Sequence, residues 1–389
     1  SVMASDPAHD RVWTSAGDLL GLGLEGVVSR EADPLTLDPT AFVGVAGFPG
    51  PLVDLNGDGL LDVIAWSLGG DPVGPPPPFE VALGVGDGTF VGTASVATRG
   101  MPLAALAADL TGDGVPDLVT ETAAPGFVAD LALAVGRGDG TFEAGEVFAA
   151  QSLASSLRAL DVDGDGDLDV VGAVHVGEQA SVVTWLNAAG VLRPGPTTPW
   201  ESNLAAGAAA FDLGDLNGDG LPDLVASGQP LRILLGSGGG VFAASEVLDV
   251  GFAPRLVHLA DLDGDGALDV VTAGPLGSLV AGVQPTQELV VHRGDGAGSF
   301  AAASVSRQAI PLLGLALDSA DFDLDGRLDV SLSTWHGPTV ALGLGGGVLA
   351  AAVPFAGPFG VARVGDLDGD GDPDLLVSQP TTVLLNAVR

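Results

Sequence analysis

Residues 159–170 read "ALDVDGDGDLDV" and place five aspartates within nine positions, at 161, 163, 165, 167 and 169. No basic residue lies among them. Like charges this close repel one another and favour a disordered coil unless a cation lies between them. This stretch alone leaves three interpretations: a disordered acidic tract, a pair of catalytic carboxylates, or a metal site.

The same pattern occurs seven times along the chain. The copies are "DLNGDGLLD" (54–62), "DLTGDGVPD" (109–117), "DVDGDGDLD" (161–169), "DLNGDGLPD" (215–223), "DLDGDGALD" (261–269), "DFDLDGRLD" (321–329) and "DLDGDGDPD" (366–374). Their start-to-start spacings are 55, 52, 54, 46, 60 and 45 residues. A recurrence at this period is typical of a repeat architecture.

The flanking sequences repeat as well. An apolar run precedes and follows each acidic motif, and a further strand-like run then ends in a Gly-rich turn such as "VGDGTF" (85–90). Gly-Asp-Gly between apolar runs is a hairpin signal. Each unit therefore predicts four antiparallel strands, with the acidic loop between strands one and two. Such units are blades of an all-β, seven-bladed β-propeller, since the alternative, a β-solenoid, uses shorter periods.

The two ends of the chain complement each other. The last unit stops after its third strand at "TTVLLNAVR" (381–389), whereas a spare strand, "DPLTLDPTAF" (33–42), precedes the first acidic motif. We expect this N-terminal strand to complete the last blade and close the ring. The predicted domains are therefore a propeller over 33–389 and an N-terminal extension over 1–32 that caps an edge or is partly disordered.

Composition excludes several classes of partner. The 47% hydrophobic content excludes a disordered chain. The formal net charge is −37, with 13 Lys and Arg and no basic patch, which argues against nucleic acid and anionic membrane surfaces as partners and favours divalent cations. No apolar run reaches the roughly 18 residues that span a bilayer, so we expect no membrane insertion.

The repeated pattern is D-x-[D/N/T]-x-D-G-x-x-D. It supplies side-chain oxygens at positions 1, 3, 5 and 9, and the position 7 carbonyl can complete the set. Hard oxygen donors without His or Cys favour Ca²⁺ over zinc or copper, and Mg²⁺ demands stricter octahedral geometry. An EF-hand is excluded because position 12 has no Glu and the flanks are strands. Catalysis by these loops would require seven equivalent active sites, which metal binding explains better.

The repeated "DLNGDGLLDV" loops and "GDGTF" hairpins resemble the FG-GAP/VCBS repeats of integrin α-subunit propellers and secreted bacterial propellers. The resemblance implies up to seven structural Ca²⁺ on one face of the ring and an unknown protein or glycan partner on the opposite face. It also implies an extracellular or cell-surface location, although no signal-peptide pattern is visible in the sequence.

Carried over position by position, the resemblance assigns the following metal ligands, where the position 7 residue contributes its carbonyl only. They are Asp54, Asn56, Asp58, Leu60 and Asp62; Asp109, Thr111, Asp113, Val115 and Asp117; Asp161, Asp163, Asp165, Asp167 and Asp169; Asp215, Asn217, Asp219, Leu221 and Asp223; Asp261, Asp263, Asp265, Ala267 and Asp269; Asp321, Asp323, Asp325, Arg327 and Asp329; and Asp366, Asp368, Asp370, Asp372 and Asp374. Thr111 is a neutral, poorer donor, and Leu324 replaces the usual Gly in the sixth loop.

The function that follows is a calcium-binding module for interaction or adhesion rather than an enzyme. A sugar-binding propeller, a polysaccharide lyase or other propeller enzyme, and a purely structural repeat remain alternatives. Without Tyr, a sugar-stacking site must use Trp or Phe. The candidate ligand contacts are Trp66 at the end of strand two of blade one, Trp200 in the connection "RPGPTTPWESN" (193–203), and Trp335 and His336 after strand two of blade six.

Overall fold

The computed structural model describes residues 5–6, 11–12, 37–41, 47–67, 75–124, 128–150, 154–176, 179–200, 210–276, 286–308, 315–334, 336–355, 359–379 and 381–386. Contacts divide the chain into Ser1–Pro34 and Leu35–Arg389. In the first unit, β1 (Ser5–Asp6) pairs antiparallel with β2 (Arg11–Val12). Among the described residues, none forms a helix long and apolar enough to cross a membrane.

The second unit contains seven sheets of four antiparallel strands, which we number as blades in chain order. Blades 1 to 3 consist of β4 (Phe48–Val53), β5 (Asp62–Trp66), β6 (Phe79–Gly84) and β7 (Phe90–Val96); β8 (Met101–Ala108), β9 (Asp117–Ala124), β10 (Val128–Ala134) and β11 (Glu146–Ala150); and β12 (Ala154–Leu160), β13 (Asp169–Val176), β14 (Gln179–Leu186) and β15 (Arg193–Trp200).

Blades 4 and 5 consist of β16 (Phe211–Gly214), β17 (Asp223–Ala226), β18 (Leu231–Gly236) and β19 (Phe242–Leu248); and β20 (Leu256–Ala260), β21 (Asp269–Leu276), β22 (Thr286–Gly294) and β23 (Phe300–Gln308). Blade 6 contains β24 (Ala316–Ala320), β25 (Asp329–Thr334), β26 (Gly337–Ala341) and β29 (Val353–Pro354), with a small hairpin of β27 (Gly343–Gly345) and β28 (Val348–Leu349). Blade 7 contains β30 (Phe359–Gly365), β31 (Asp374–Gln379), β32 (Thr381–Asn386) and β3 (Leu37–Ala41).

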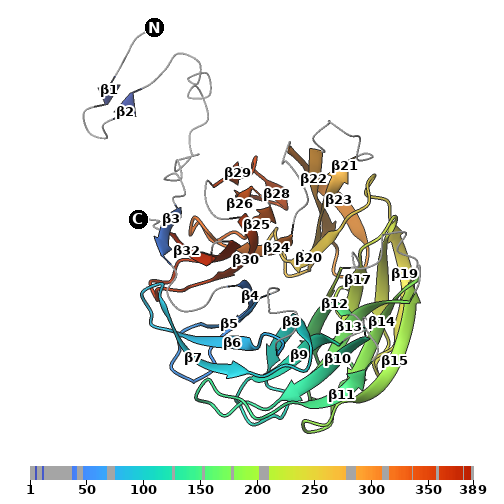
Figure 1. Cartoon of the computed structure of the whole chain (residues 1–389). Helices are drawn as coiled ribbons and strands as arrows, with labels where there is room; N and C mark the ends of the chain where they lie inside the picture. Colours follow the sequence, from blue (N-terminus) through green and yellow to red (C-terminus); the bar gives the residue numbers. More distant parts are fainter. Residues whose placement is uncertain are drawn as a thin grey trace, which may run out of the picture. The chain divides into compact units, whose positions relative to one another are not determined.

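The blades form a closed ring (Figure 1). Their first strands contact one another in the order β4, β8, β12, β16, β20, β24 and β30, and β30 in turn contacts β4. These seven strands therefore line the centre of the ring. The fold is the predicted all-β, seven-bladed propeller.

The ring closes through the N-terminal strand, as the sequence predicted. β3 pairs antiparallel with β32, the third strand of blade 7, with Leu37 opposite Asn386 and Ala41 opposite Thr382. Early and late parts of the chain thus share one sheet (Figure 1). Blade 7 cannot be completed before both ends are present, so closure couples the two ends of this unit.

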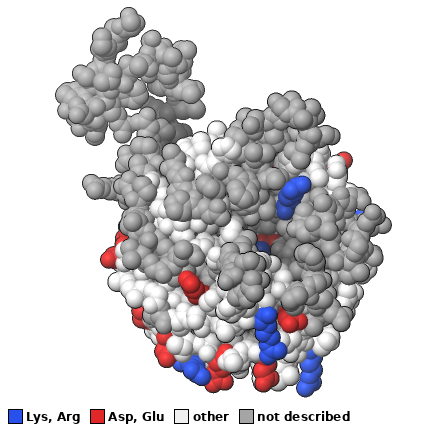
Figure 2. Space-filling model, viewed as in Figure 1, with Lys and Arg blue, Asp and Glu red and all other residues white. Residues whose placement is uncertain are grey.

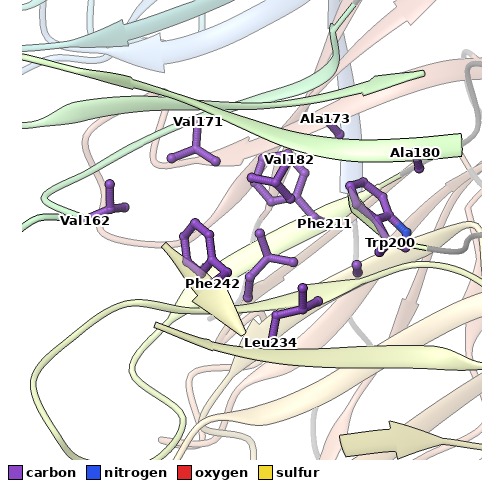
Figure 3. Packing of buried hydrophobic residues seen from close by; sticks show 11 residues of the cluster. Val162, Val171, Ala173, Ala180, Val182, Trp200, Phe211, Leu234 and Phe242 are labelled. Carbon is purple, nitrogen blue, oxygen red and sulfur yellow. The ribbon is translucent and has the colours of Figure 1, made fainter. Parts of the chain in front are cut away.

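The core lies between neighbouring blades. All five residues of β5, Asp62–Trp66, are buried, because the second strand of a blade is covered on both sheet faces. Between blades 3 and 4, Val182 and Trp200 pack with Phe211 and Leu234 (Figure 3). Apolar packing of one blade on the next, repeated around the ring, therefore holds the propeller together and positions the acidic loops.

Candidate metal sites

The seven acidic loops connect the first and second strands of their blades, where the sequence placed them. Each loop turns through left-handed backbone at its fourth and sixth positions; in the third loop these are Gly164 with φ +83° and Gly166 with φ +96°. In the sixth loop the fourth position is Leu324, which adopts φ +56° despite its side chain. The turn therefore depends on two positive-φ residues in each loop.

The side chains at positions 1, 3 and 5 hold the backbone of the third loop in this turn. In the third loop, Asp161 Oδ1 accepts a hydrogen bond from Gly164 N at 2.7 Å, and Asp161 Oδ2 accepts one from Gly166 N at 3.0 Å. Asp163 Oδ1 accepts from Asp165 N at 3.1 Å, and Asp165 Oδ1 accepts from Asp167 N at 2.9 Å. The carboxylates are thereby fixed on one side of the loop.

The aspartate at position 9 has a second, structural role. Asp269 is fully buried; its Oδ2 accepts a hydrogen bond from Leu262 N at 3.0 Å, and its Oδ1 accepts one from Gly294 N at 2.9 Å. The same two-sided arrangement recurs in all seven blades. Burial raises the pKa of Asp329 and of Asp374 to about 6. Position 9 therefore joins the loop to the end of its blade's third strand.

The residue at position 2 joins each loop to the core and to the next blade. This residue is buried in every loop, from Phe322 at 0% exposed to Leu367 at 4%. Its carbonyl accepts a hydrogen bond from the following blade, at the end of strand three or in the turn after it, in five of the seven loops: Leu110 from Asn187, Val162 from Gly240, Leu216 from Gly298, Phe322 from Asn386, and Leu367 from Gly88. An ordered acidic loop thus orders the joint between two blades.

Four loops bring three carboxylates close enough to share a metal ion. The groups, with one oxygen of each residue within 4.8 Å of the others, are Asp161, Asp163 and Asp169; Asp261, Asp263 and Asp265; Asp321, Asp323 and Asp325; and Asp366, Asp368 and Asp374. Burial, and then the neighbouring carboxylates, raise the pKa of Asp163, Asp323 and Asp368. This cluster of hard oxygen donors fits a divalent cation, which would relieve that repulsion.

Three of the predicted carboxylate ligands therefore lie together in each of these four loops, and the loops differ in what surrounds them. In the sixth loop the Arg327 guanidinium forms an ion pair with Asp325, and Arg327 Nε donates to Gly343 O at 3.1 Å. In the fifth loop Arg293 lies 3.7 Å from Asp263. In the second loop the Thr111 hydroxyl is buried and has no hydrogen-bond partner. An arginine beside a carboxylate competes with a bound cation.

A family model for the FG-GAP-like repeat matches residues 54–120, 161–226, 215–272 and 321–377, which together cover more than half of the chain. The chain belongs to the FG-GAP-like repeat family. Each matched segment starts at the first aspartate of an acidic loop. A search of curated proteins found no match to the chain.

Among solved structures, the chain is similar to a lectin from Agrocybe aegerita that recognises non-reducing terminal N-acetylglucosamine, with 18% identity, a TM-score of 0.56, and coverage of 91% of this chain and 86% of the lectin. It is also similar to BBS1N, solved in complex with ARL6DN, with 11% identity, a TM-score of 0.57, and coverage of 91% and 97%. At these identities the similarity concerns the fold alone.

Two of the predicted ligand contacts belong to the core. Trp66 is 8% exposed and packs edge-on against Phe79 at 5.5 Å between ring centroids. Trp200 is 3% exposed, donates from Nε1 to Ser227 O at 3.1 Å, and ends β15 rather than lying in a connection (Figure 3). These buried rings offer little surface for stacking a sugar. His336 is exposed between β25 and β26, and Trp335 lies outside the described residues.

The sequence analysis missed one group of residues on the inner strands. Three positions before each acidic loop the chain carries Pro51, Leu106, Arg158, Asp212, His258, Asp318 and Arg363 in blades 1 to 7. The signal was present in the sequence, because a charged or titratable residue interrupts five otherwise small and apolar strands at the same register. Here the structure brings several of these side chains into contact.

Proposed function

We propose that the chain is a calcium-binding, extracellular β-propeller that acts as an interaction module, and that its calcium ions are structural. The observation that carries this proposal is the double attachment of the acidic loops, through position 9 to their own blade in all seven and through the position 2 carbonyl to the next blade in five. A cation that ordered the loop would stiffen the joint between blades and keep the rest of the ring rigid.

Charge supports the same proposal. Seven Ca²⁺ ions would change the formal net charge from −37 to −23. When the free Ca²⁺ concentration is about 100 times the dissociation constant of a site, binding at that site stabilises the folded state by about 2.7 kcal/mol. Calcium is present at millimolar concentration outside cells, where extracellular sites of low affinity are occupied. The extracellular or cell-surface location is proposed on this ground and on the resemblance to integrin and secreted bacterial propellers.

The test is to count bound calcium by equilibrium dialysis at 2 mM CaCl₂, followed by elemental analysis. We expect up to seven ions per chain, and one fewer in the variant Asp163→Asn/Asp165→Asn. The matched control is Asp249→Asn, which removes an exposed carboxylate outside the acidic loops and should leave the count unchanged. A wild-type chain that binds no calcium would overturn the proposal.

The partner is proposed to be a protein that binds the face opposite the acidic loops, where His336 is exposed. A glycan is the other outcome to be tested, and the shared fold of the Agrocybe aegerita lectin does not favour it over a protein. Binding on a glycan array that is lost in His336→Ala would favour the glycan. We also keep the division into an extension over 1–32 and a propeller over 33–389 as part of the proposal.

A further inference from the structure

The inner strands of blades 3 to 6 carry a connected set of polar side chains near the centre of the ring. Arg158 Nε on β12 donates to Asp212 Oδ1 on β16 at 3.0 Å. Asp212 Oδ2 accepts from Leu259 N at 3.0 Å and lies 3.4 Å from His258 Nδ1 on β20. His258 Nε2 lies 2.9 Å from Ser319 Oγ on β24. Four consecutive blades are thus linked side chain to side chain.

Solvent reaches this set from the centre of the ring. The side chains of Asp212, His258 and Arg158 are 13%, 19% and 43% exposed. Acidic and basic atoms are visible near the centre of the ring in the space-filling view (Figure 2). The groups are therefore neither sealed in the core nor spread over the outer surface.

The chemistry of these groups determines which of them donates and which accepts at each hydrogen bond. Because a carboxylate accepts only, the neutral form of His258 is the one with its proton on Nδ1, toward Asp212. Its Nε2 is then the acceptor, and the Ser319 hydroxyl donates to it. Burial alone would raise the pKa of Asp212, but the hydrogen bond from His258 and the charge of Arg158 outweigh burial and lower it. Asp212 is therefore charged and able to orient the imidazole.

Two of these residues, Ser319 and His258, stand out from the other blades. Two positions before each acidic loop the chain has Leu52, Ala107, Ala159, Leu213, Leu259, Ser319 and Val364, so blade 6 places a hydroxyl where the other blades have an aliphatic side chain. Three positions before the loop, blade 5 alone has His. Local departures from a consistent pattern are expected at functional sites. Here two such residues, in the consecutive blades 5 and 6, meet.

Positive charge lies on the same inner strands. Arg363 Nε on β30 donates to Gly50 O at 3.1 Å, and the charges of Asp318 and Arg158 both act on its guanidinium. Burial is the main cause that lowers the pKa of Arg363 below its usual range. Guanidinium groups held near a reacting centre favour negative charge that develops there.

We propose that Ser319 is an activated nucleophile, with His258 as its general base and Asp212 as the group that orients His258, and that the centre of the ring hydrolyses a small carboxylic ester. A hydroxyl bonded to an imidazole that a carboxylate orients is the arrangement that performs acyl transfer. This activity is independent of the acidic loops and of the proposed interaction function.

The steps balance without a further cofactor. Ser319 Oγ bonds to the ester carbonyl carbon while its proton passes to His258 Nε2. The carbon–oxygen bond to the alcohol then breaks, and the alcohol leaves with that proton. Water attacks the acyl-serine with His258 again accepting a proton, and the carboxylic acid leaves as Ser319 regains its own. The only co-reactant is water.

The test uses the full chain with 2 mM CaCl₂ and a fluorophosphonate probe, with the labelled residue identified by peptide mass spectrometry. We expect label on Ser319, no label at that peptide in Ser319→Ala, and at least a tenfold slower labelling rate in His258→Gln. The matched control is Ser156→Ala, a serine on the inner strand β12, which should leave labelling of Ser319 unchanged.

Two results would overturn the proposal: a folded wild-type chain that is not labelled on Ser319, or labelling of Ser319 at an equal rate in His258→Gln. Hydrolysis of p-nitrophenyl acetate gives a second readout, with a burst of p-nitrophenol expected from wild type and none from Ser319→Ala. The labelling of the wild-type chain can refute the proposal by itself, even if a variant fails to fold.

Discussion

The acidic loops and the inner-strand positions three residues before them lie close together in the sequence but follow opposite rules. The first, fifth and ninth positions of the loop are Asp in all seven blades, whereas the inner-strand position is Pro51, Leu106, Arg158, Asp212, His258, Asp318 or Arg363. A residue needed in every loop recurs in every blade, whereas the inner-strand position varies from blade to blade. The comparison separates what every blade shares from what differs between the blades.

The largest expected effect concerns the repeated position 9. Asp269→Ala removes the acceptor of two hydrogen bonds and leaves the buried Leu262 and Gly294 N–H groups unpaired. Each unpaired group costs about 1–3 kcal/mol, so we expect the free energy of unfolding to fall by about 3 kcal/mol. Urea denaturation in EDTA measures this without any contribution from calcium.

The control for that variant is Asp265→Ala, the exposed position 5 of the same loop, for which we expect a change within about 0.5 kcal/mol in EDTA. If the two variants lost equal stability, position 9 would have no structural role beyond its negative charge.

The sequence predicted the fold because the features that decide it repeat. Seven acidic motifs, the Gly-rich turns and the spare N-terminal strand indicated blade number, strand order and ring closure, which the pairing of β3 with β32 confirms. Trp200 was misplaced because Pro194 and Pro199, which are typical of a loop, are accommodated in β15, an outer edge strand that needs fewer backbone donors.

The contacts at the centre of the ring could not be predicted in the same way. His258 and Ser319 are 61 residues apart and belong to different blades, so their contact depends on how neighbouring inner strands are staggered. The two hydrogen bonds of Asp269 could not be predicted for a related reason. In the sequence, position 9 has the same pattern as the other oxygen ligands, and only its burial in the structure distinguishes it from positions 1, 3 and 5.

The charged residues at the inner-strand position should also contribute to stability, but less than position 9 of the acidic loops. Asp212→Asn removes the charge that pairs with Arg158 and His258, and we expect a loss of about 2 kcal/mol at pH 7. The pKa of Asp212 is lower in the folded chain, so its contribution is complete above the ordinary value of about 3.9 and is lost as the pH falls through the folded value.

The difference in unfolding free energy between wild type and Asp212→Asn should therefore shrink below about pH 4. Urea denaturation in EDTA at several pH values measures it. The exposed control Asp249→Asn should show a small difference at every pH. If the difference in unfolding free energy between wild type and Asp212→Asn grew as the pH fell, the negative charge of Asp212 would not be what stabilises the folded chain.

A smaller effect should separate the acidic loops from one another. Arg327→Gln removes the guanidinium that pairs with Asp325 and should tighten calcium binding in the sixth loop. Exposed ion pairs are worth at most about 1 kcal/mol, so we expect a two- to fivefold change in affinity. Calcium titration by calorimetry, with the exposed Arg99→Gln as control, measures it. Unchanged or weaker binding would show that Arg327 does not compete with calcium.

The smallest effect concerns the one loop that lacks a glycine at position 4. Leu324 adopts φ +56° with its side chain 47% exposed, so Leu324→Gly relieves backbone strain and loses little packing. The left-handed penalty of about 1–2 kcal/mol is partly offset by the greater backbone freedom of unfolded Gly, and we expect a gain of about 0.5 kcal/mol. Thermal unfolding should show the reverse for Gly264→Leu, the matched position in the fifth loop. If Leu324→Gly were less stable than wild type, the backbone at Leu324 would not be strained.

The central claim is that cations in the acidic loops hold neighbouring blades together, and thermal unfolding with and without EDTA tests it most directly. We predict that EDTA lowers the melting temperature by at least about 10 °C and that excess CaCl₂ restores it, because several sites each contribute about 2.7 kcal/mol when saturated. A melting curve that is the same in EDTA and in 2 mM CaCl₂ would contradict the claim.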